Sequence, residues 1–448
     1  MTGGARTSLR DVVASTPESR DRFVDLVRVG SIVAVVLGHW LMAVVVERGG
    51  RVHGENALSA IPALRPLTWV VQIIAVFFVV GGYTNARALA GGRDVGTFFR
   101  RRAERVLRPT IVFAAVWLAV AVVLEHSSID PRVVHDATRL AAQPLWFLAV
   151  FAATIAIAPA QYALHRRHPW VVLLLAPVAT IALDVVRLAG SSDTPATVNY
   201  LTVFAVAQEL GFHYADGRFE SVRRPAALGV AVAAFALLGV LTVAGPYPVS
   251  MVGVPGQKIS NMSPPTVCML VLMVAQCALL LAVREPLRRR LGHPGTWSVV
   301  VGVNLVIMTL FLWHLSALVF VAAIASRLGH LPAAGTAGWW AQKPLWLGAC
   351  ALVLAGLVRL FMPVERLRSW LVAGRSAVVA RGVGLVVAGL GLVGFATSGF
   401  GHAFEAGSVF LGMRFPPAVD FVLLVSGWLV ATWPLGTVER GGARNDGG

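Results

Sequence analysis

Charge is what this sequence has least of. Only 13% of its 448 residues are Asp, Glu, Lys or Arg, whereas 57% are hydrophobic. A soluble chain of this length would carry about twice that charged fraction. The composition therefore excludes an ordinary soluble enzyme, and together with a mean hydropathy of +0.73 it indicates an integral membrane protein.

Lysine and cysteine are also scarce. Lys258 and Lys343 are the only lysines, so the net charge of +16 comes almost wholly from arginine. The three cysteines, Cys268, Cys277 and Cys350, lie in apolar surroundings without metal-ligand spacing, which favours a packing role. The sequence contains no phosphate-binding glycine loop, zinc-binding His-Glu helix or serine elbow. We therefore expect no metal.

Long apolar segments are what the sequence has in abundance. Segments of about 20 residues can cross a bilayer as helices, so we predict an all-α, polytopic membrane bundle of ten core spans plus two C-terminal ones. The predicted spans are Phe23–Val46, Pro66–Ala90, Pro109–Leu124, Leu145–Leu164, Trp170–Ala189, Val198–Tyr214, Pro225–Ala244, Pro265–Val283, Trp297–Ala325 and Lys343–Phe361, followed by Ala377–Gly399 and Pro416–Trp433.

Arginines divide the connections into two sets. Every second connection is basic, as are the N-terminal residues, and cytoplasmic loops are the ones that carry such an excess. We therefore predict a cytoplasmic N-terminus. We attribute the many arginines to orientation of the protein in the membrane rather than to nucleic-acid binding. The first 22 residues lack an apolar core, so no cleavable signal peptide is expected. The basic connections are 87–108, 165–168, 218–224, 284–290 and 359–381.

This pattern gives three regions. Residues 1–22 are expected to form a cytoplasmic tail, 23–365 the main transmembrane domain, and 366–448 an extension with two possible spans. The connection 245–264 has the composition of a turn-rich lid, although a plain connection would look the same.

The first apolar segment contains Arg28 and His39. Eleven positions separate them, so a helix places both on one face, about 16 Å apart along its axis. Ionisable side chains inside a membrane face a protein interior or a wet cavity. We therefore expect both residues to line one internal cavity entered from the cytoplasm. Asp25 could orient the Arg28 guanidinium or only neutralise it.

His39 has two possible chemical roles. A neutral imidazole can take a proton from a hydroxyl and so make an alcohol nucleophilic. It can also accept an acyl group itself and pass it on. The sequence leaves both roles open.

Other polar residues have a functional and a structural interpretation. Arg102 and Arg105, in FFRRRAERVLRPT, are one helical turn apart and could hold phosphate groups; they could equally set topology and contact anionic lipid. Trp146 opens a span in QPLWFL, and His314 lies inside a span in TLFLWHL. Buried histidines of this kind are often structural.

A further pair, Glu209 and His213 in QELGFHYADG, is four residues apart and could form a hydrogen bond on one helix face. Function and structural polar contact are both open for this pair.

Several of these motifs, in this order, resemble the membrane-bound acyltransferase family 3. The family's first-span pattern matches 25–28 and 38–39, and its second-span phrase matches 77–83, with Gly81 in place of the usual serine. Its R-x-x-R matches Arg102 and Arg105, and its later aromatic strings match 145–148 and 312–314. The resemblance covers about residues 20 to 365, so the C-terminal extension lies outside it.

The resemblance implies a multi-pass enzyme of the bacterial plasma membrane and cell envelope. Such enzymes take an acyl group, commonly acetyl, from acyl-CoA at the cytoplasmic side. They place it on a hydroxyl of a sugar, glycan, lipid-linked saccharide or secreted metabolite. No fused esterase-like domain follows, so an extracellular acceptor could require a separate partner; the lipid bilayer is the other partner expected, and nucleic acid is not.

The resemblance also assigns roles to residues of this sequence. His39 and Arg28 would be catalytic. Donor or acceptor binding would fall to Arg102, Arg105, Asp25, Trp146 and His314.

Two other functions use the same residues. A proton-coupled transporter or exporter could use the buried histidine and arginine as a path, although no internal repeat or matched pair of broken spans supports it. The third possible function is that of an inactive scaffold. The intact pair of Arg28 and His39 argues against it.

Overall fold

A computed structural model describes residues 9–17, 20–48, 51–92, 94–190, 192–329, 331–366, 378–405, 407–410 and 413–433. Arg6 of the predicted tail and residues 367–377 of the last basic connection lie outside these residues. The elements are α1 (Leu9–Ala14), α2 (Arg22–Met42), β1 (Ala43–Arg48), β2 (Arg51–Asn56), α3 (Ala57–Ala60), η1 (Pro62–Leu67), α4 (Thr68–Val71), α5 (Ile74–Ala90), α6 (Val95–Glu125), α7 (Pro131–Ala142), α8 (Leu145–Arg167), α9 (Val171–Ala189), η2 (Pro195–Val198), α10 (Asn199–Ala215), α11 (Arg224–Gly239), η3 (Val240–Ala244), α12 (Val267–Ala282), α13 (Arg284–Arg290), α14 (Pro294–Asn304), α15 (Ile307–Arg327), α16 (Ala337–Arg366), α17 (Val378–Ser398), β3 (Ser408–Phe410), β4 (Met413–Phe415) and α18 (Pro417–Thr432).

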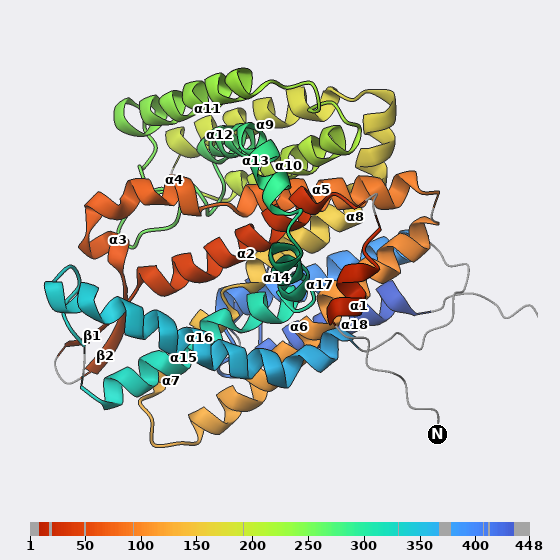
Figure 1. Cartoon of the computed structure of the whole chain (residues 1–448). Helices are drawn as coiled ribbons and strands as arrows, with labels where there is room; N and C mark the ends of the chain where they lie inside the picture. The colour runs from red at the N-terminus through yellow and green to blue at the C-terminus, as the bar shows by residue number, and fades with distance from the viewer. Residues whose placement is uncertain are drawn as a thin grey trace, which may run out of the picture.

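The helices lie side by side in one bundle (Figure 1), and each of the twelve predicted apolar segments contains at least one of them. Within the described residues, nine helical spans are long and apolar enough to cross a membrane, or ten if the bent pair α12–α13 counts as one. Helices α10 and α18 are shorter, with 17 and 16 residues. The predicted polytopic helical membrane fold is confirmed.

Two predicted spans differ from their helices. The first stops at Met42, because the β-branched run 44–46 continues as β1, which pairs antiparallel with β2. The segment Trp297–Ala325 is divided into α14 and α15, with a break at 305–306. Neither difference changes the fold class.

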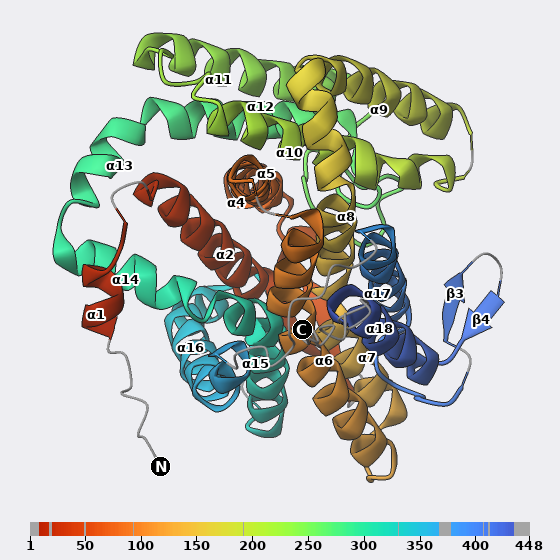
Figure 2. The ribbon, with the colours of Figure 1, turned by 90° about the vertical axis from the view of Figure 1, so that its right-hand side faces the viewer.

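Helix α2 runs through the middle of the bundle. It contacts α5, α14, α15 and α16, as the view along the bundle shows (Figure 2). Asp21 begins it, because its side chain accepts hydrogen bonds from the backbone N–H groups of Phe23 and Val24. The ionisable residues of α2 therefore face other helices.

The two ends of the bundle differ in charge. We call the end where α2 begins the basic end, since Arg87, Arg101 and Arg105 lie there around one pocket. The opposite end, which we call the far end, carries β1, β2, α7 and the connection 245–266. The hairpin β1–β2 and helix α1 lie at opposite sides of Figure 1.

The connection 245–266 is a folded part of the far end. Asp184 of α9 accepts hydrogen bonds from the Tyr247 hydroxyl at 3.0 Å and the Val267 N–H at 2.8 Å. Arg187 donates to the carbonyls of Ser260 and Pro264. Burial, and then the neighbouring Asp184 carboxylate, raises the pKa of the Tyr247 hydroxyl, so this group keeps its proton and remains a donor. The connection is thus fixed against α9.

The C-terminal extension is packed into the bundle. Helices α17 and α18 form a hairpin that contacts α6 and α8. The two helices approach closely through glycines: a Cβ on Gly391 would lie 2.3 Å from the Asp420 carbonyl oxygen, and one on Gly427 would lie 2.3 Å from the Ala388 nitrogen. Only glycine fits such a backbone approach.

Replacing Gly391 by Ala should therefore destabilise the protein by about 1–3 kcal/mol, the usual cost of overpacking. The measurement is thermal unfolding of the detergent-solubilised protein followed by tryptophan fluorescence. Gly348→Ala is the matched control, because Gly348 is also helical and a Cβ there meets nothing within 4 Å. Equal unfolding temperatures for the two variants would contradict this account of the hairpin.

Candidate active site

Two histidines meet inside the bundle. His39 of α2 and His314 of α15 have ring centroids 5.1 Å apart, and His39 Nδ1 lies 3.4 Å from His314 Nε2. His314 is fully buried, whereas His39 is partly exposed to a cavity. The sequence separation is 275 residues, so only the fold brings them together.

Backbone carbonyls fix the tautomers of both rings. His39 Nδ1 lies 2.8 Å from the Val35 carbonyl oxygen, and His314 Nδ1 lies 2.5 Å from that of Phe311. A carbonyl can only accept, so both Nδ1 atoms carry hydrogen and both Nε2 atoms carry lone pairs. His314 Nε2 faces the His39 N–H. Among the described residues no group bonds His39 Nε2, which leaves this nitrogen as a base toward the cavity.

Tryptophans hold the helices around this pair. The Trp40 indole N–H donates to the His314 carbonyl oxygen at 2.9 Å, and the Trp346 indole N–H donates to the Trp40 carbonyl oxygen at 3.1 Å. These two bonds connect α2, α15 and α16 beside the histidines. The imidazole positions are therefore set by three helices rather than by a loop.

A cavity of about 920 Å³ extends from the histidines to the far end. Its inner wall includes Trp146, Phe147 and Phe311, and most of its other lining side chains are aliphatic. Polar residues gather where it meets the far end, namely Glu55, Asn56, Asp130, Asp136, Ser263 and Arg327. We call this space the far cavity. The connection 245–266 contributes to its wall.

A second cavity, of about 470 Å³, lies at the basic end. We call it the basic pocket. Arg28 lines it, and Asp25 lies 3.6 Å from Arg28 Nη1 while also accepting from Arg20 Nε at 2.5 Å. Six arginines and two aspartates contribute to its wall, which gives it an excess of positive charge; the arginines are Arg20, Arg28, Arg87, Arg101, Arg102 and Arg105.

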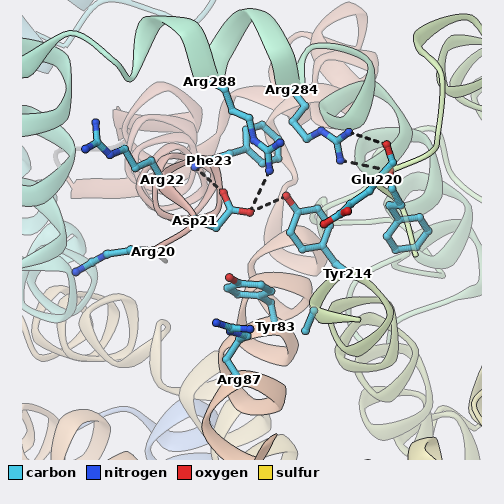
Figure 3. A pocket seen from close by; sticks show the side chains of 12 residues that line it. Arg20, Asp21, Arg22, Phe23, Tyr83, Arg87, Tyr214, Glu220, Arg284 and Arg288 are labelled. Atoms are coloured by element: carbon cyan, nitrogen blue, oxygen red, sulfur yellow. Dashed lines mark hydrogen bonds and ion pairs between the residues drawn. The ribbon is translucent and has the colours of Figure 1, made fainter. Parts of the chain in front are cut away.

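The basic pocket continues into a neighbouring space of about 480 Å³, shown in Figure 3. The two share Arg20, Asp21, Tyr83 and Arg87 in their walls. In the neighbouring space Asp21 accepts hydrogen bonds from the Tyr214 hydroxyl at 3.0 Å and from Arg288 at 3.3 Å. Tyr83 and Arg87 approach from the opposite wall (Figure 3). Together these spaces offer cations and aromatic faces, a combination suited to a nucleotide anion.

The predicted single cavity around Arg28 and His39 is wrong. The far cavity and the basic pocket share no lining residue. Along α2 the basic pocket ends at Arg28 and the far cavity begins at Ala34, a distance of about 9 Å along the helix.

Two phenylalanines line the far cavity, and a third packs behind one of them. Phe147 and Phe311 line the cavity with their ring centroids 4.9 Å apart. Phe77 packs on Phe147 at 5.3 Å, and it lies on α5 between Ile74 of the far cavity and Tyr83 of the basic pocket. We call these three residues the aromatic septum. Phe77 and Phe147 belong to motifs noted in the sequence, but nothing there showed that their rings meet.

The structure thus divides the predicted site residues into two groups. Arg28, Arg102, Arg105 and Asp25 lie at the basic pocket, whereas His39, Trp146 and His314 lie at the far cavity. The sequence analysis missed Arg20 and Arg87 as pocket residues. Arg87 could have been noticed, because it falls in a basic connection at the end of a motif-bearing helix.

The predicted hydrogen bond between Glu209 and His213 is also wrong. His213 Nε2 lies 3.9 Å from Glu209 Oε1, which is too long. Glu209 instead accepts from His165 Nδ1 at 2.5 Å, and His213 Nε2 donates to the Pro169 carbonyl oxygen at 2.9 Å. These groups lie on α8 and α10, away from both cavities.

Comparison with known proteins gives one match. A family model described as an acyltransferase domain, that of the acyltransferase 3 family, matches residues 21–361. No curated protein and no solved structure matches. The matched range includes both cavities and the septum and ends before α17.

The two-cavity arrangement predicts access from opposite sides of the membrane. Cysteine placed at Ala88, in the basic pocket, and at Ser128, in the far cavity, should react with a membrane-impermeant maleimide added on opposite sides of sealed vesicles. The unaltered chain is the control, since Cys268 and Cys350 are buried. Labelling of both positions from one side would contradict the arrangement.

Proposed function

Because this chain belongs to the acyltransferase 3 family, we propose that it transfers an acyl group, acetyl in the simplest case, from acyl-CoA to a hydroxyl group of an acceptor. The donor binds at the basic pocket, and the acceptor enters the far cavity. The observation that carries this proposal is His39 Nε2, a nitrogen with a free lone pair at the inner wall of a large cavity.

His39 supplies the base in the simplest mechanism. Its Nε2 takes the proton of the acceptor hydroxyl while that oxygen attacks the thioester carbonyl carbon. The tetrahedral intermediate then collapses, the carbon–sulfur bond breaks, and the imidazolium returns the proton to the leaving thiolate. The products are an ester and free CoA. His314 acts as a positioning residue, since its lone pair faces the His39 Nδ1–H and favours the tautomer that leaves Nε2 basic.

An acyl-histidine route remains the second form of this chemistry. Here His39 Nε2 attacks the thioester, and the acceptor hydroxyl then attacks the acyl-imidazole. The same tautomer serves both routes, because each begins with the Nε2 lone pair.

Charge supports the placement of the donor. Coenzyme A carries a pyrophosphate and a further phosphate, and arginine binds such groups through paired N–H donors. The excess of arginine in the basic pocket, with Tyr83 and Tyr214 close by, suits this nucleotide end. With the basic end in the cytoplasm, as positive-inside topology favours, the donor comes from the compartment that contains acyl-CoA.

The septum sets a condition on this transfer. The thioester must cover about 9 Å between Arg28 and the start of the far cavity. We propose that the phenylalanines of the septum occupy that region. A pantetheine arm is long and narrow enough to span this depth if these side chains change rotamer. Transfer therefore requires a conformational change of the septum during each cycle.

The wall of the far cavity constrains the acceptor. Aliphatic and aromatic side chains surround the inner part, whereas polar side chains lie at its far end. A hydroxyl carried on a partly apolar body fits this distribution, because burying a fully polar sugar there would leave its other hydroxyls without partners. Among the expected acceptor classes, this favours lipid-linked saccharides and amphipathic secreted metabolites.

His39→Ala should abolish acyl transfer while leaving expression and membrane insertion intact, because it removes the only nitrogen base that the described far-cavity wall presents with a free lone pair. The assay compares O-acylated products, by mass spectrometry, in a deletion strain carrying the wild-type or variant chain. His135→Ala, on the exposed face of α7, is the control. Retained activity at equal protein level would exclude His39 from the reaction.

Replacing both Arg102 and Arg105 by Ala should weaken acyl-CoA binding about tenfold or more, equivalent to about 1.4 kcal/mol. Lysine at both positions should restore only part of the lost affinity, since lysine lacks the planar guanidinium group with its paired N–H donors. Affinity is measured by titrating the solubilised protein with acetyl-CoA. Arg108→Ala serves as control, because Arg108 is on the same helix, contacts Glu104 and does not line the pocket. Unchanged affinity in the double variant would mean that these arginines do not bind acyl-CoA and only help to orient the protein in the membrane.

A further inference from the structure

Three buried ionisable side chains and one exposed carboxylate meet at the ends of α8 and α10, outside both cavities. His165 comes from α8, Glu209 and His213 from α10, and Asp216 follows α10. The side chains of the first three are 1%, 0% and 2% exposed. Burial of so many ionisable groups is costly unless each is paired or bound to an ion. The proposed acyl transfer uses none of them.

The ligand atoms converge on one point. One nitrogen from each histidine and one Glu209 oxygen all lie within 4.8 Å of one another. In a tetrahedral zinc site, with bonds of about 2.0–2.1 Å, ligand atoms are separated by about 3.3 Å. Small rotations of these side chains would therefore enclose an ion. Two imidazoles and one carboxylate form a donor set that suits Zn²⁺.

The surrounding hydrogen bonds are those of a metal site. Metal-bound histidines usually donate their second ring nitrogen to a carboxylate or carbonyl, and bound carboxylates are themselves hydrogen-bonded. Here the second nitrogen of His165, Nε2, lies 3.0 Å from Asp216 Oδ2. Gln161 Nε2 donates to the second oxygen of Glu209 at 2.9 Å. His165 Nδ1 and Glu209 Oε1 therefore face each other at 2.5 Å. His213 Nε2 lies 3.9 Å from the same Glu209 oxygen and would exchange its bond to the Pro169 carbonyl for the ion.

We propose that His165, Glu209 and His213 bind a divalent transition-metal ion, Zn²⁺ in the first instance, as a structural site that joins α8 to α10. The pattern of the sequence singled out Glu209 and His213 but not a metal site, because the third ligand, His165, comes from another helix 44 residues away and lies in a basic connection. The proposed site lies next to the wall of the space beside the basic pocket. Tyr214, the residue after His213, donates a hydrogen bond to Asp21 in that wall.

The test is metal analysis of the whole protein purified in detergent with a tag that contains no histidine. We expect close to one zinc per chain by elemental analysis. Removal with a chelator should lower the thermal unfolding temperature, and ZnSO₄ alone should restore it. X-ray absorption should show nitrogen and oxygen neighbours at about 2.0–2.2 Å.

Variants locate the site. Glu209→Gln and His213→Gln should each weaken Zn²⁺ binding at least about tenfold, and Asp216→Asn, which changes only the outer carboxylate, should weaken it less. His168→Gln is the matched control, since His168 is exposed in the same connection and lies outside the cluster. If folded wild-type protein contains no stoichiometric metal and added Zn²⁺ leaves its unfolding temperature unchanged, the cluster is only a proton-bridged network and the proposal is wrong.

Discussion

The hydrogen bond from the Trp40 indole to the His314 carbonyl is the contact on which the site depends. It joins α2 to α15 at the depth where their histidines meet, and Trp346 extends the connection to α16. In an apolar bundle an indole N–H left without an acceptor would be costly, so this bond favours one rotation of both helices. That rotation turns His39 toward the far cavity and Arg28 toward the basic pocket. A small change in it would separate the histidines and expose an ionisable group to lipid.

Two compartments with opposite chemistry follow from that arrangement. The basic pocket attracts anions, and the far cavity has an apolar wall with polar groups at its outer end. The two spaces share no lining residue. In the proposed mechanism the aromatic septum has to open for a flexible thioester and yet keep water and ions from crossing. Catalytic rate and membrane integrity would then place opposing demands on the same three phenylalanines.

Much of the fold could be predicted from the sequence, since apolar segments must become helices in a membrane. The positions of Arg28, Arg102 and Arg105 near one pocket also followed, because helical periodicity and the arginine-rich connections constrain them. The separation into two cavities could not be predicted from the sequence. Spacing along α2 gives the positions of Arg28 and His39 along the helix axis, but not what fills the space between them. The contact of His39 with His314 and the cluster around His165 depend on helix packing, which no local pattern encodes. For the same reason Glu209 pairs with another helix and not with its own neighbour.

The hairpin α17–α18 lies beyond the family match, yet Arg381 of α17 is buried and donates to the Gly96 carbonyl at the start of α6. Helix α6 carries Arg102 and Arg105, so helices that come much later in the sequence complete the surroundings of an early one. During synthesis, the earlier helices must wait in the membrane with one face of α6 and α8 covered only by lipid or by the insertion machinery. Maturation of the basic pocket therefore has to wait for α17 and α18, and chains truncated before residue 378 would be exposed to membrane quality control.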